Sequence, residues 1–294
     1  MRALTIDAHG GLDRLRLRDD LAEPVITQAT EVRVRLRAAA LNRLDLWTLQ
    51  GFPGARIVPP WVLGSDGMGI IDAVGSSVSR VAVGDTVFLN PGISCRQCEY
   101  CRSGDNPLCL SFRVLGEHVP GTLAEYVVVP EDNVRSIPGA TPPEVAAAFP
   151  MATLTAWRMC VTRARVGPGD EVLIWGIGGG VAQAALRVCQ RRGARTWVTS
   201  SSDDKLERAR ALGADETLRH GPDADIGREI RARTGKRGVD VVIDSVGAAT
   251  WAQSLGALGR RGRLVTCGGT SGHAVETDVR RLFWNQWTLM GSTM

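Results

Sequence analysis

The second half of the chain alternates apolar runs with segments of helical pattern, and this alternation constrains the fold more than any other feature. Strand-like runs occupy 170–177, 195–200, 238–247, 262–269 and 286–294, and helical segments occupy 180–194, 203–214 and 249–261. Strands that are apolar throughout are typical of a parallel sheet with helices on both faces. This half is therefore predicted to be a doubly wound α/β sheet.

The first of these strands ends in a glycine-rich turn, "WGIGGGV" at 175–181. Such a turn lets a pyrophosphate approach the backbone N–H groups at the start of the next helix. Val181 stands where the usual G-x-G-x-x-G has its third glycine, and the spacing Gly176, Gly179, Ala182 fits better. The turn, with Gly180 included, is a candidate dinucleotide site; a plain tight turn is the alternative.

The end of the second strand bears on which dinucleotide binds. An Asp or Glu at this point would bind the ribose diol of NAD(H). Here the sequence reads "WVTSSSDDKLE", so the strand ends at Ser200 and Ser201, and Lys205 follows one turn into the helix. Hydroxyl groups and a cation suit a 2′-phosphate, whereas Asp203 and Asp204 fit helix N-capping. NADP(H) is therefore predicted in preference to NAD(H).

The first half has a different pattern. Short alternating or β-branched runs lie at 31–41, 69–75, 85–89 and 124–130 and are separated by Gly and Pro, which indicates a β-rich domain. A helical segment at 141–166, with Pro142 and Pro143 near its start, marks the change to the α/β half. We predict two domains, 1–145 and 146–294.

Four of the seven cysteines lie within one short segment, with the spacing C-x2-C-x2-C-x7-C. Four thiolates so spaced close a tetrahedral zinc site and leave no open coordination position, so the zinc would be structural. The alternatives are an iron–sulfur cluster, a redox dithiol or disulfides. The expected zinc lobe spans about 90–112, and its ligands are Cys95, Cys98, Cys101 and Cys109.

Composition excludes several classes of function. The net charge is +4, and arginines occur singly or in pairs, which does not favour nucleic acid as a partner. No run of 18 apolar residues exists, so no membrane span is predicted. The N-terminal segment lacks an apolar signal core, so a cytoplasmic location with reduced thiols is expected.

Together these motifs resemble the zinc-containing medium-chain dehydrogenase/reductase superfamily, which includes alcohol dehydrogenases and quinone reductases. The resemblance covers essentially the whole chain. It rests on "GSDGMGIIDAVG", "VGDTVFL", the cysteine lobe, "GTLAEYVVVP", "TLTAW", the glycine turn and "GVDVVIDSVG". It implies an α/β protein with a GroES-like catalytic domain, a Rossmann domain, a small-molecule substrate, and a homodimer or homotetramer.

The resemblance also makes three substitutions informative. Alcohol dehydrogenases of this superfamily hold a catalytic zinc with a Cys, a His in a G-H-E motif, and a third ligand that is usually Cys. These positions fall here on Asn42, Ser65 and Met151, whose side chains are not the thiolates or imidazoles that zinc prefers. "NRLD" resembles instead the N-x-x-D of zinc-free quinone and enoyl reductases, which meet enolate charge with hydrogen-bond donors.

The same resemblance suggests catalytic roles. Asn42 is a candidate donor to a substrate carbonyl or to the cofactor amide, or else a turn residue. Ser65 could donate similarly. Asp45 and Asp66 could orient Asn42 or relay a proton, although structural hydrogen bonds to loop backbone are the plainer interpretation.

Two further residues match cofactor positions of the superfamily. Arg43 matches a position that contacts the pyrophosphate, for which a guanidinium is well suited; a solvated loop arginine is the alternative. Thr155 matches a position against the nicotinamide and could equally belong to the core.

Members of this superfamily usually continue beyond a segment such as "LMGSTM", so the C-terminal part of the usual fold is expected to be missing here. The predicted function is NADPH-dependent reduction of an enone, an enoyl compound or a quinone without a catalytic metal. Two alternatives stay open: a zinc-independent lyase or cyclase, and a non-catalytic nucleotide- or partner-binding protein.

Overall fold

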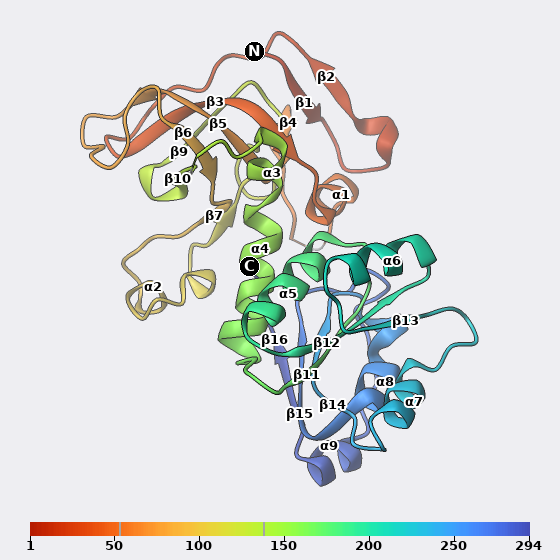
Figure 1. Ribbon diagram of the computed structural model, residues 1–294. Helices are drawn as coiled ribbons and strands as arrows, with labels where there is room; N and C mark the ends of the chain where they lie inside the picture. The colour runs from red at the N-terminus through yellow and green to blue at the C-terminus, as the bar shows by residue number, and fades with distance from the viewer. Residues whose placement is uncertain (53, 138) are drawn as a thin grey trace. The chain divides into compact units, whose positions relative to one another are not determined.

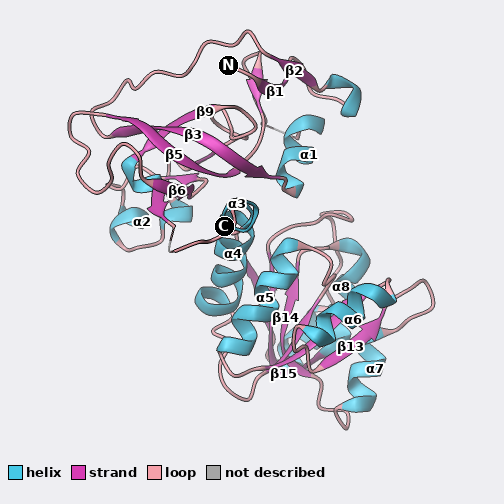
Figure 2. Cartoon of the chain, turned by 45° about the horizontal axis from the view of Figure 1, so that its top comes forward, coloured by secondary structure: helices cyan, strands magenta, loops and turns pink. Residues whose placement is uncertain are grey.

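The computed structural model describes residues 1–52, 54–137 and 139–294 (Figure 1). The chain forms two compact units, Met1–Met151 and Ala152–Met294. Figure 2 shows that most helices belong to the second unit, whereas the first consists mainly of strands and loops. The division falls inside helix α4 (Pro150–Trp157), shortly after the predicted change of pattern.

The first unit is built around an antiparallel five-stranded sheet with the order β10-β6-β5-β3-β9. Its longest strand, β3, alternates as the sequence predicts, because Val32 and Val34 are fully buried while their neighbours are not. The strands are β3 (Glu31–Ala40), β5 (Asp66–Val74), β6 (Thr86–Leu89), β9 (Tyr126–Pro130) and β10 (Val134–Ser136).

Smaller elements complete this unit. A three-stranded sheet has the order β2-β1-β4, and β7 pairs with β8. Helix α1 directly follows β3, so the end of the longest strand leads into a helix N-terminus. The elements are β1 (Ala3–Ile6), β2 (Arg16–Arg18), β4 (Trp61–Val62), β7 (Gly92–Ile93), β8 (Arg113–Val114), α1 (Arg43–Gln50), α2 (Glu99–Arg102), α3 (Pro143–Ala148), and 3-10 turns at Leu12–Arg14, Asn106–Leu108 and Glu131–Asn133.

The second unit contains a six-stranded parallel sheet with the order β13-β12-β11-β14-β15-β16. Strand β11 lies between β12 and β14, so the strand order reverses there, and ligands bind doubly wound sheets at such a point. The strands are β11 (Glu171–Ile174), β12 (Arg195–Ser200), β13 (Glu216–Arg219), β14 (Val239–Asp244), β15 (Leu258–Thr266) and β16 (Thr288–Gly291).

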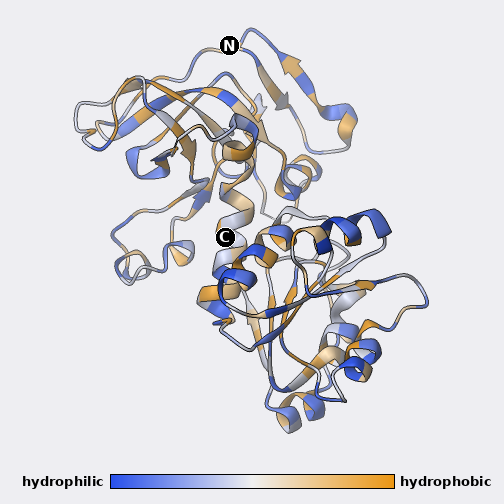
Figure 3. Ribbon diagram, in the orientation of Figure 1, coloured by the Kyte–Doolittle hydropathy of each residue, from blue (hydrophilic) through white to orange (hydrophobic). Residues whose placement is uncertain are grey.

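Two hydrophobic clusters separate the helices of this unit into two layers. One cluster joins the sheet to α4, α5 and α6, and the other joins it to α7, α8 and α9. In Figure 3 the strands are mainly apolar and the outer helices carry polar stretches, as expected for a sheet covered on both faces. The remaining helices are a π-helical turn (Arg158–Arg163), α5 (Gly180–Arg191), α6 (Asp203–Ala211), α7 (Ile226–Arg233), α8 (Ala248–Ala257) and α9 (Val279–Asn285).

The predicted fold class is confirmed, with differences in detail. Strand β13 was not predicted, because "ETLR" is short and polar, and α7 and α9 were not predicted either. The helix expected at 249–261 ends at Ala257, since Leu258 already belongs to β15. In the part of the chain that the structure describes, no helix is both long and apolar enough to cross a membrane.

Candidate functional site

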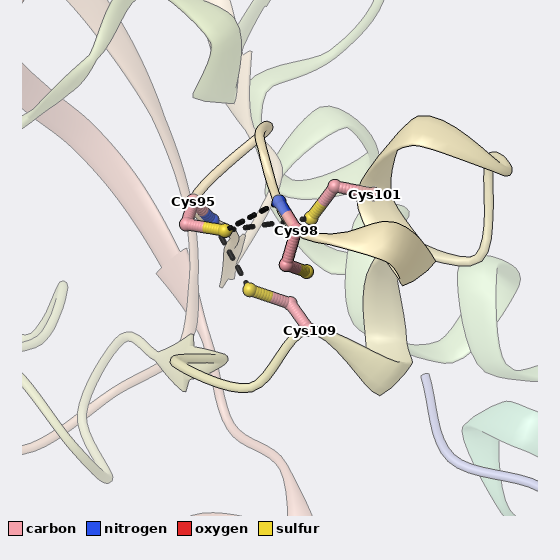
Figure 4. Close-up of side chains that lie close together, drawn as sticks. All are labelled: Cys95, Cys98, Cys101 and Cys109. Atoms are coloured by element: carbon pink, nitrogen blue, oxygen red, sulfur yellow. Dashed lines mark hydrogen bonds between the residues drawn. The ribbon is translucent and has the colours of Figure 1, made fainter.

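The four clustered cysteines converge in the first unit (Figure 4). Cys95 follows β7, Cys98 and Cys101 come from the start and body of α2, and Cys109 follows a 3-10 turn. All four Sγ atoms lie within 4.8 Å of one another, and those of Cys95 and Cys101 are 3.9 Å apart. A tetrahedral zinc with Zn–S bonds of about 2.3 Å requires sulfur atoms about 3.8 Å apart. The geometry therefore fits zinc.

Backbone groups help this cluster to hold negative charge. The N–H of Cys95 donates to Cys109 Sγ at 3.2 Å, and the N–H of Cys98 donates to Cys95 Sγ at 3.4 Å. The first of these bonds is the main reason why the pKa of Cys109 falls to about 6. Zinc binds thiolates, so the environment of Cys109 favours the ligand form of this residue. The lobe is a closed structural zinc site, and no disulfide links its cysteines.

The three positions that the resemblance aligns with catalytic-zinc ligands also lie near one another in the first unit. Asn42 precedes α1, and Ser65 and Asp66 stand at the start of β5. Asn42 Nδ2 donates to Asp66 Oδ2 at 3.0 Å and to Ser65 Oγ at 3.3 Å. The backbone N–H of Met151 donates to Asp66 Oδ1 at 2.9 Å. The Asp66 carboxylate therefore binds Asn42 and the Met151 backbone, and Asn42 in turn binds Ser65.

Burial controls the acidity of the two carboxyls here. Asp66 is 1% exposed, and burial raises its pKa to about 6, against the lowering effect of hydrogen bonds from Asn42 and Met151. Burial also raises the pKa of Asp45, which accepts hydrogen bonds from the backbone N–H groups of Asn42 (2.6 Å) and Gly64. Asp45 thus fixes the backbone of Asn42, and Asp66 fixes its side chain. Both act as orienting residues for this amide.

The predicted dinucleotide site lies in the second unit. Gly176 follows β11 with a φ of +67°, a conformation that side-chain-bearing residues rarely adopt. Gly179 is the N-cap of α5, Gly180 is its first residue and Val181 its second. The glycine turn therefore leads directly into the helix N-terminus, where backbone N–H groups can bind a pyrophosphate. Gly178, Gly179 and Gly180 are exposed. The turn leaves room for close approach of a phosphate group.

The residues predicted to contact the cofactor ribose lie at and after the end of β12. Ser200 is buried and its Oγ accepts a hydrogen bond from the Ser202 N–H at 3.1 Å, while Ser201 is exposed. The Lys205 side chain reaches back to the glycine turn, since a β-carbon added at Gly178 would lie 3.0 Å from its Nζ. Among the described residues Lys205 has no ion-pair partner. Asp203, by contrast, is neutralised by Arg219.

Two further predicted residues lie apart from these groups. Arg43 is the exposed first residue of α1 in the first unit, next to Asn42. Thr155 is a buried residue of α4 in the second unit. In the first unit, the predicted catalytic residues therefore form one hydrogen-bond network. In the second unit, the residues predicted to bind the pyrophosphate and the ribose lie at the same edge of the sheet.

One residue at this edge of the sheet, Asp244, was not predicted from the sequence. Asp244, at the end of β14, accepts hydrogen bonds from the backbone of Val246 and Gly247 and from the hydroxyls of Thr250 and Ser254. It therefore fixes the loop at the carboxyl end of β14. A buried acidic residue that ends an apolar strand, in "VVIDSVG", is the signal that could have identified it.

Comparison with known proteins identifies the family. Residues 28–139 match the alcohol dehydrogenase GroES-like domain, and residues 180–294 match the zinc-binding dehydrogenase family. A crystal structure of an NAD-dependent alcohol dehydrogenase is 44% identical, with a TM-score of 0.94, over 100% of this chain and 85% of that one. The chain belongs to the zinc-containing medium-chain dehydrogenase/reductase superfamily. It is an NAD(P)-dependent oxidoreductase with a GroES-like domain and a Rossmann domain.

Other members of the superfamily that resemble this chain have different names. The acryloyl-coenzyme A reductase of Metallosphaera sedula is 33% identical over 240 residues, which cover 81% of this chain and 69% of that protein. The human quinone oxidoreductase is 26% identical over 294 residues, which cover 100% of this chain and 80% of that protein. Membership alone therefore does not select the substrate.

Proposed function

We propose that this medium-chain dehydrogenase/reductase is an NADPH-dependent reductase of an enone, an enoyl compound or a quinone, and that it transfers hydride without a catalytic metal. The observation that carries the proposal is the network around Asp66. Asn42 and Ser65 offer an amide and a hydroxyl, and Met151 contributes its backbone N–H, at the positions where the resemblance expects zinc-dependent relatives to hold the metal. The side chains of Asn, Ser and Met are not the thiolates or imidazoles that zinc prefers. The names of the quinone and acryloyl-coenzyme A reductases support the same reaction class.

The network suggests how the reaction is assisted. When bound, a reduced nicotinamide would supply hydride to the carbon β to a carbonyl; negative charge would develop on the carbonyl oxygen, and a proton from solvent would then complete the reduction at the α-carbon. Asn42 is partly exposed, whereas Ser65 and Asp66 are buried. One Nδ2 hydrogen of Asn42 is anchored on Asp66, and the other makes only the longer bond to Ser65. We propose that a substrate carbonyl takes over this second hydrogen, which stabilises the developing enolate.

Asp66 is a positioning residue in this scheme. Its carboxyl orients the Asn42 amide and also binds the backbone of Met151. Its pKa of about 6 lets it exchange a proton near neutral pH, as a relay requires. Asp45 holds the Asn42 backbone, and Ser65 holds the second amide hydrogen until substrate arrives. Arg43 and Thr155 keep their proposed roles towards the pyrophosphate and the nicotinamide.

The preference for NADP(H) rests on the end of β12. Ser200 and Ser201 put hydroxyls there instead of a carboxylate, and Lys205 is a cation without an ion-pair partner among the described residues. The relative that is called NAD-dependent favours the opposite preference for this chain. Steady-state kinetics with NADPH and NADH decide the matter, and a higher kcat/KM with NADH would overturn the NADP(H) assignment.

The main experiment follows NADPH oxidation with a panel of enones, enoyl thioesters and quinones. We expect turnover with at least one of these classes and one zinc per chain by metal analysis. Conversion of a panel substrate without net NADPH oxidation would favour a lyase or cyclase. NADPH binding without turnover would favour a nucleotide-binding protein. Two zinc ions per chain would contradict the metal-free mechanism.

A variant at Asn42 tests the proposed donor. Asn42→Asp keeps the size of the side chain and removes the N–H groups. We expect kcat/KM to fall by about 100-fold or more, the loss seen when one oxyanion donor is removed, while NADPH affinity changes little. Asn285→Asp is the matched control, because Asn285 Nδ2 only donates to the Arg281 carbonyl in α9. Equal activity of both variants would exclude the role of Asn42.

We also propose that the enzyme is a homodimer or homotetramer. Strand β16 is at the edge of the six-stranded sheet, where its backbone groups can pair with another strand. Phe283 and Trp284 of the preceding helix are 61% and 73% exposed. Sedimentation velocity measures the assembly directly, and a monomer at micromolar concentration would refute this proposal.

A further inference from the structure

A groove of about 670 Å³ runs along α7 and α8 within the second unit (Figure 1). The two helices approach each other closely. A β-carbon added at Gly227 of α7 would lie 3.0 Å from the Gln253 carbonyl oxygen of α8 and 3.1 Å from the carbonyl carbon of Gly256. Gly227 and Gly256 therefore give the groove a floor of backbone, and longer side chains of α7, α8 and α9 line its sides.

Three arginines line this groove. Arg228 and Arg231 lie three residues apart on α7 and so share one face of that helix, and Arg281 belongs to α9. Within the described part of the chain, none of the three guanidinium groups forms an ion pair. Arg233 lies on another face of α7 and is, by contrast, neutralised by two carboxylates. The positive charge that faces the groove is therefore not neutralised by direct contact.

The fold holds Arg231 in a fixed position. Its Nε donates to the Gly256 carbonyl at 3.0 Å, and its two terminal nitrogens donate to the carbonyls of Lys236 and Leu258. These acceptors carry no charge, so the guanidinium keeps its own. Burial lowers the pKa of Arg231, and the positive charge of Arg281 lowers it further. Two like charges are thus held near each other, and a bound anion would relieve their repulsion.

This pair of arginines is separate from the predicted cofactor site. Lys236 precedes β14, and Leu258 is the first residue of β15, so Arg231 stands at the amino edge of the parallel sheet. The glycine turn follows β11 at the carboxyl edge, where ligands of doubly wound sheets bind. A dinucleotide on the glycine turn therefore does not account for the charge of Arg231 and Arg281.

The other end of the groove has the opposite charge. Asp223 and Asp225 line it near the N-terminus of α7, and Asp225 Oδ1 accepts the backbone N–H of Arg228 at 2.9 Å as the helix cap. Carboxylates repel a phosphate group but accept hydrogen bonds from hydroxyl groups. A ligand that fits both ends has an anionic group at one end and hydroxyl groups at the other.

We propose that Arg231 and Arg281 bind the phosphate group of a small sugar phosphate, and that the hydroxyl groups of this ligand donate to Asp223 and Asp225. A guanidinium suits a phosphate because its planar N–H groups can donate to two oxygens at once. Three of the five N–H groups of Arg231 are used on carbonyls, which leaves two for the ligand. The assignment does not rest on the proposed reaction, so failure of the enone and quinone assays leaves it unaffected.

Titration calorimetry on the full chain tests the proposal. The preferred nicotinamide dinucleotide is present at saturation, so that added phosphates cannot occupy the glycine turn. The probes are ribose 5-phosphate, ribose and inorganic phosphate. We expect ribose 5-phosphate to bind most tightly, inorganic phosphate more weakly and ribose not at all.

Variants at the two ends of the groove separate the contacts. Arg281→Gln should weaken ribose 5-phosphate binding about tenfold or more, as loss of a charge-assisted hydrogen bond implies. Arg281→Lys keeps the charge and should recover part of the affinity. Asp223→Ala should weaken binding of ribose 5-phosphate but not of inorganic phosphate. Arg233→Gln is the matched control on α7 and should bind both probes as the wild type does.

Two readouts show whether the effect is local. Arg281 is exposed, so Arg281→Gln should unfold at the wild-type temperature when no ligand is present. The phosphate site is overturned if Arg281→Gln keeps the wild-type affinity for ribose 5-phosphate, or if Arg233→Gln loses as much affinity. Equal affinities of the wild type for inorganic phosphate and ribose 5-phosphate would overturn the assignment to a sugar phosphate.

Discussion

Replacing Asp66 by Asn should change how the stability of the protein depends on pH. The pKa of Asp66 is about 6 in the folded chain, against an ordinary value of 3.8, and burial is the main cause. Below pH 3.8 the carboxyl is protonated in both the folded and the unfolded chain, and its titration has no effect on stability. Between pH 3.8 and 6 the unfolded chain releases the proton first. The free energy of unfolding therefore falls as the pH rises.

The size of this effect follows from the difference in pKa. A difference of about two units corresponds to about 3 kcal/mol of lost stability, fully present above pH 6. The amide introduced by Asp66→Asn does not ionise, so the variant lacks this loss. The variant also replaces one acceptor of the Asn42 and Met151 hydrogen bonds with an NH2 group. This change lowers the stability of the variant by an amount that does not depend on pH.

The assay is urea unfolding followed by tryptophan fluorescence between pH 4 and 7.5. The free energy of unfolding of the wild type minus that of Asp66→Asn should fall by about 2 to 3 kcal/mol from pH 4 to 7. Ser65→Ala is the control: it keeps every carboxylate, so its curve should run parallel to the wild-type curve. A difference between wild type and Asp66→Asn that is constant or rises with pH would refute the argument from burial.

Three other predictions concern separate parts of the molecule. Cys109→Ser should lower the zinc content from about one ion per chain and reduce the unfolding temperature, because three thiolates no longer close the tetrahedron; an unchanged metal content would contradict this. Lys205→Ala should raise the KM for NADPH about tenfold and that for NADH much less, as loss of a charge-assisted contact to the 2′-phosphate implies; equal changes would argue against this contact. Gly121→Ala should destabilise the fold by about 2 kcal/mol or more, because its β-carbon would lie 2.1 Å from the Gly64 carbonyl oxygen. Gly167→Ala, which meets no atom within 4 Å, should be nearly neutral in the same unfolding measurement.

Much of the architecture could be predicted because it is encoded in local patterns. Alternation along β3 and the apolar runs at β11 and β14 report burial directly, and the glycine turn follows the first strand of the α/β half. Strand β13 could not be predicted in this way. Its four residues are mostly polar, and it forms because β12 offers a parallel edge for pairing.

The candidate sites also differ in how far the sequence could predict them. Spacing predicted the four zinc ligands, because all four cysteines lie in one short segment, and the structure brings their Sγ atoms together. Asn42 and Met151 are far from Asp66 in the sequence, and the fold shows that the Asn42 amide and the Met151 N–H both donate to its carboxyl.

The sequence by itself determined the two kinds of domain, the zinc lobe and the nucleotide turn. Each depends on residues that are close in the chain, so spacing and periodicity are sufficient. The tertiary structure decided which distant residues share a hydrogen-bond network and how deeply Asp66 is buried. Its raised pKa follows from that burial. Desolvation and long-range contacts depend on the packing of several segments at once, and no local pattern in the chain contains this information.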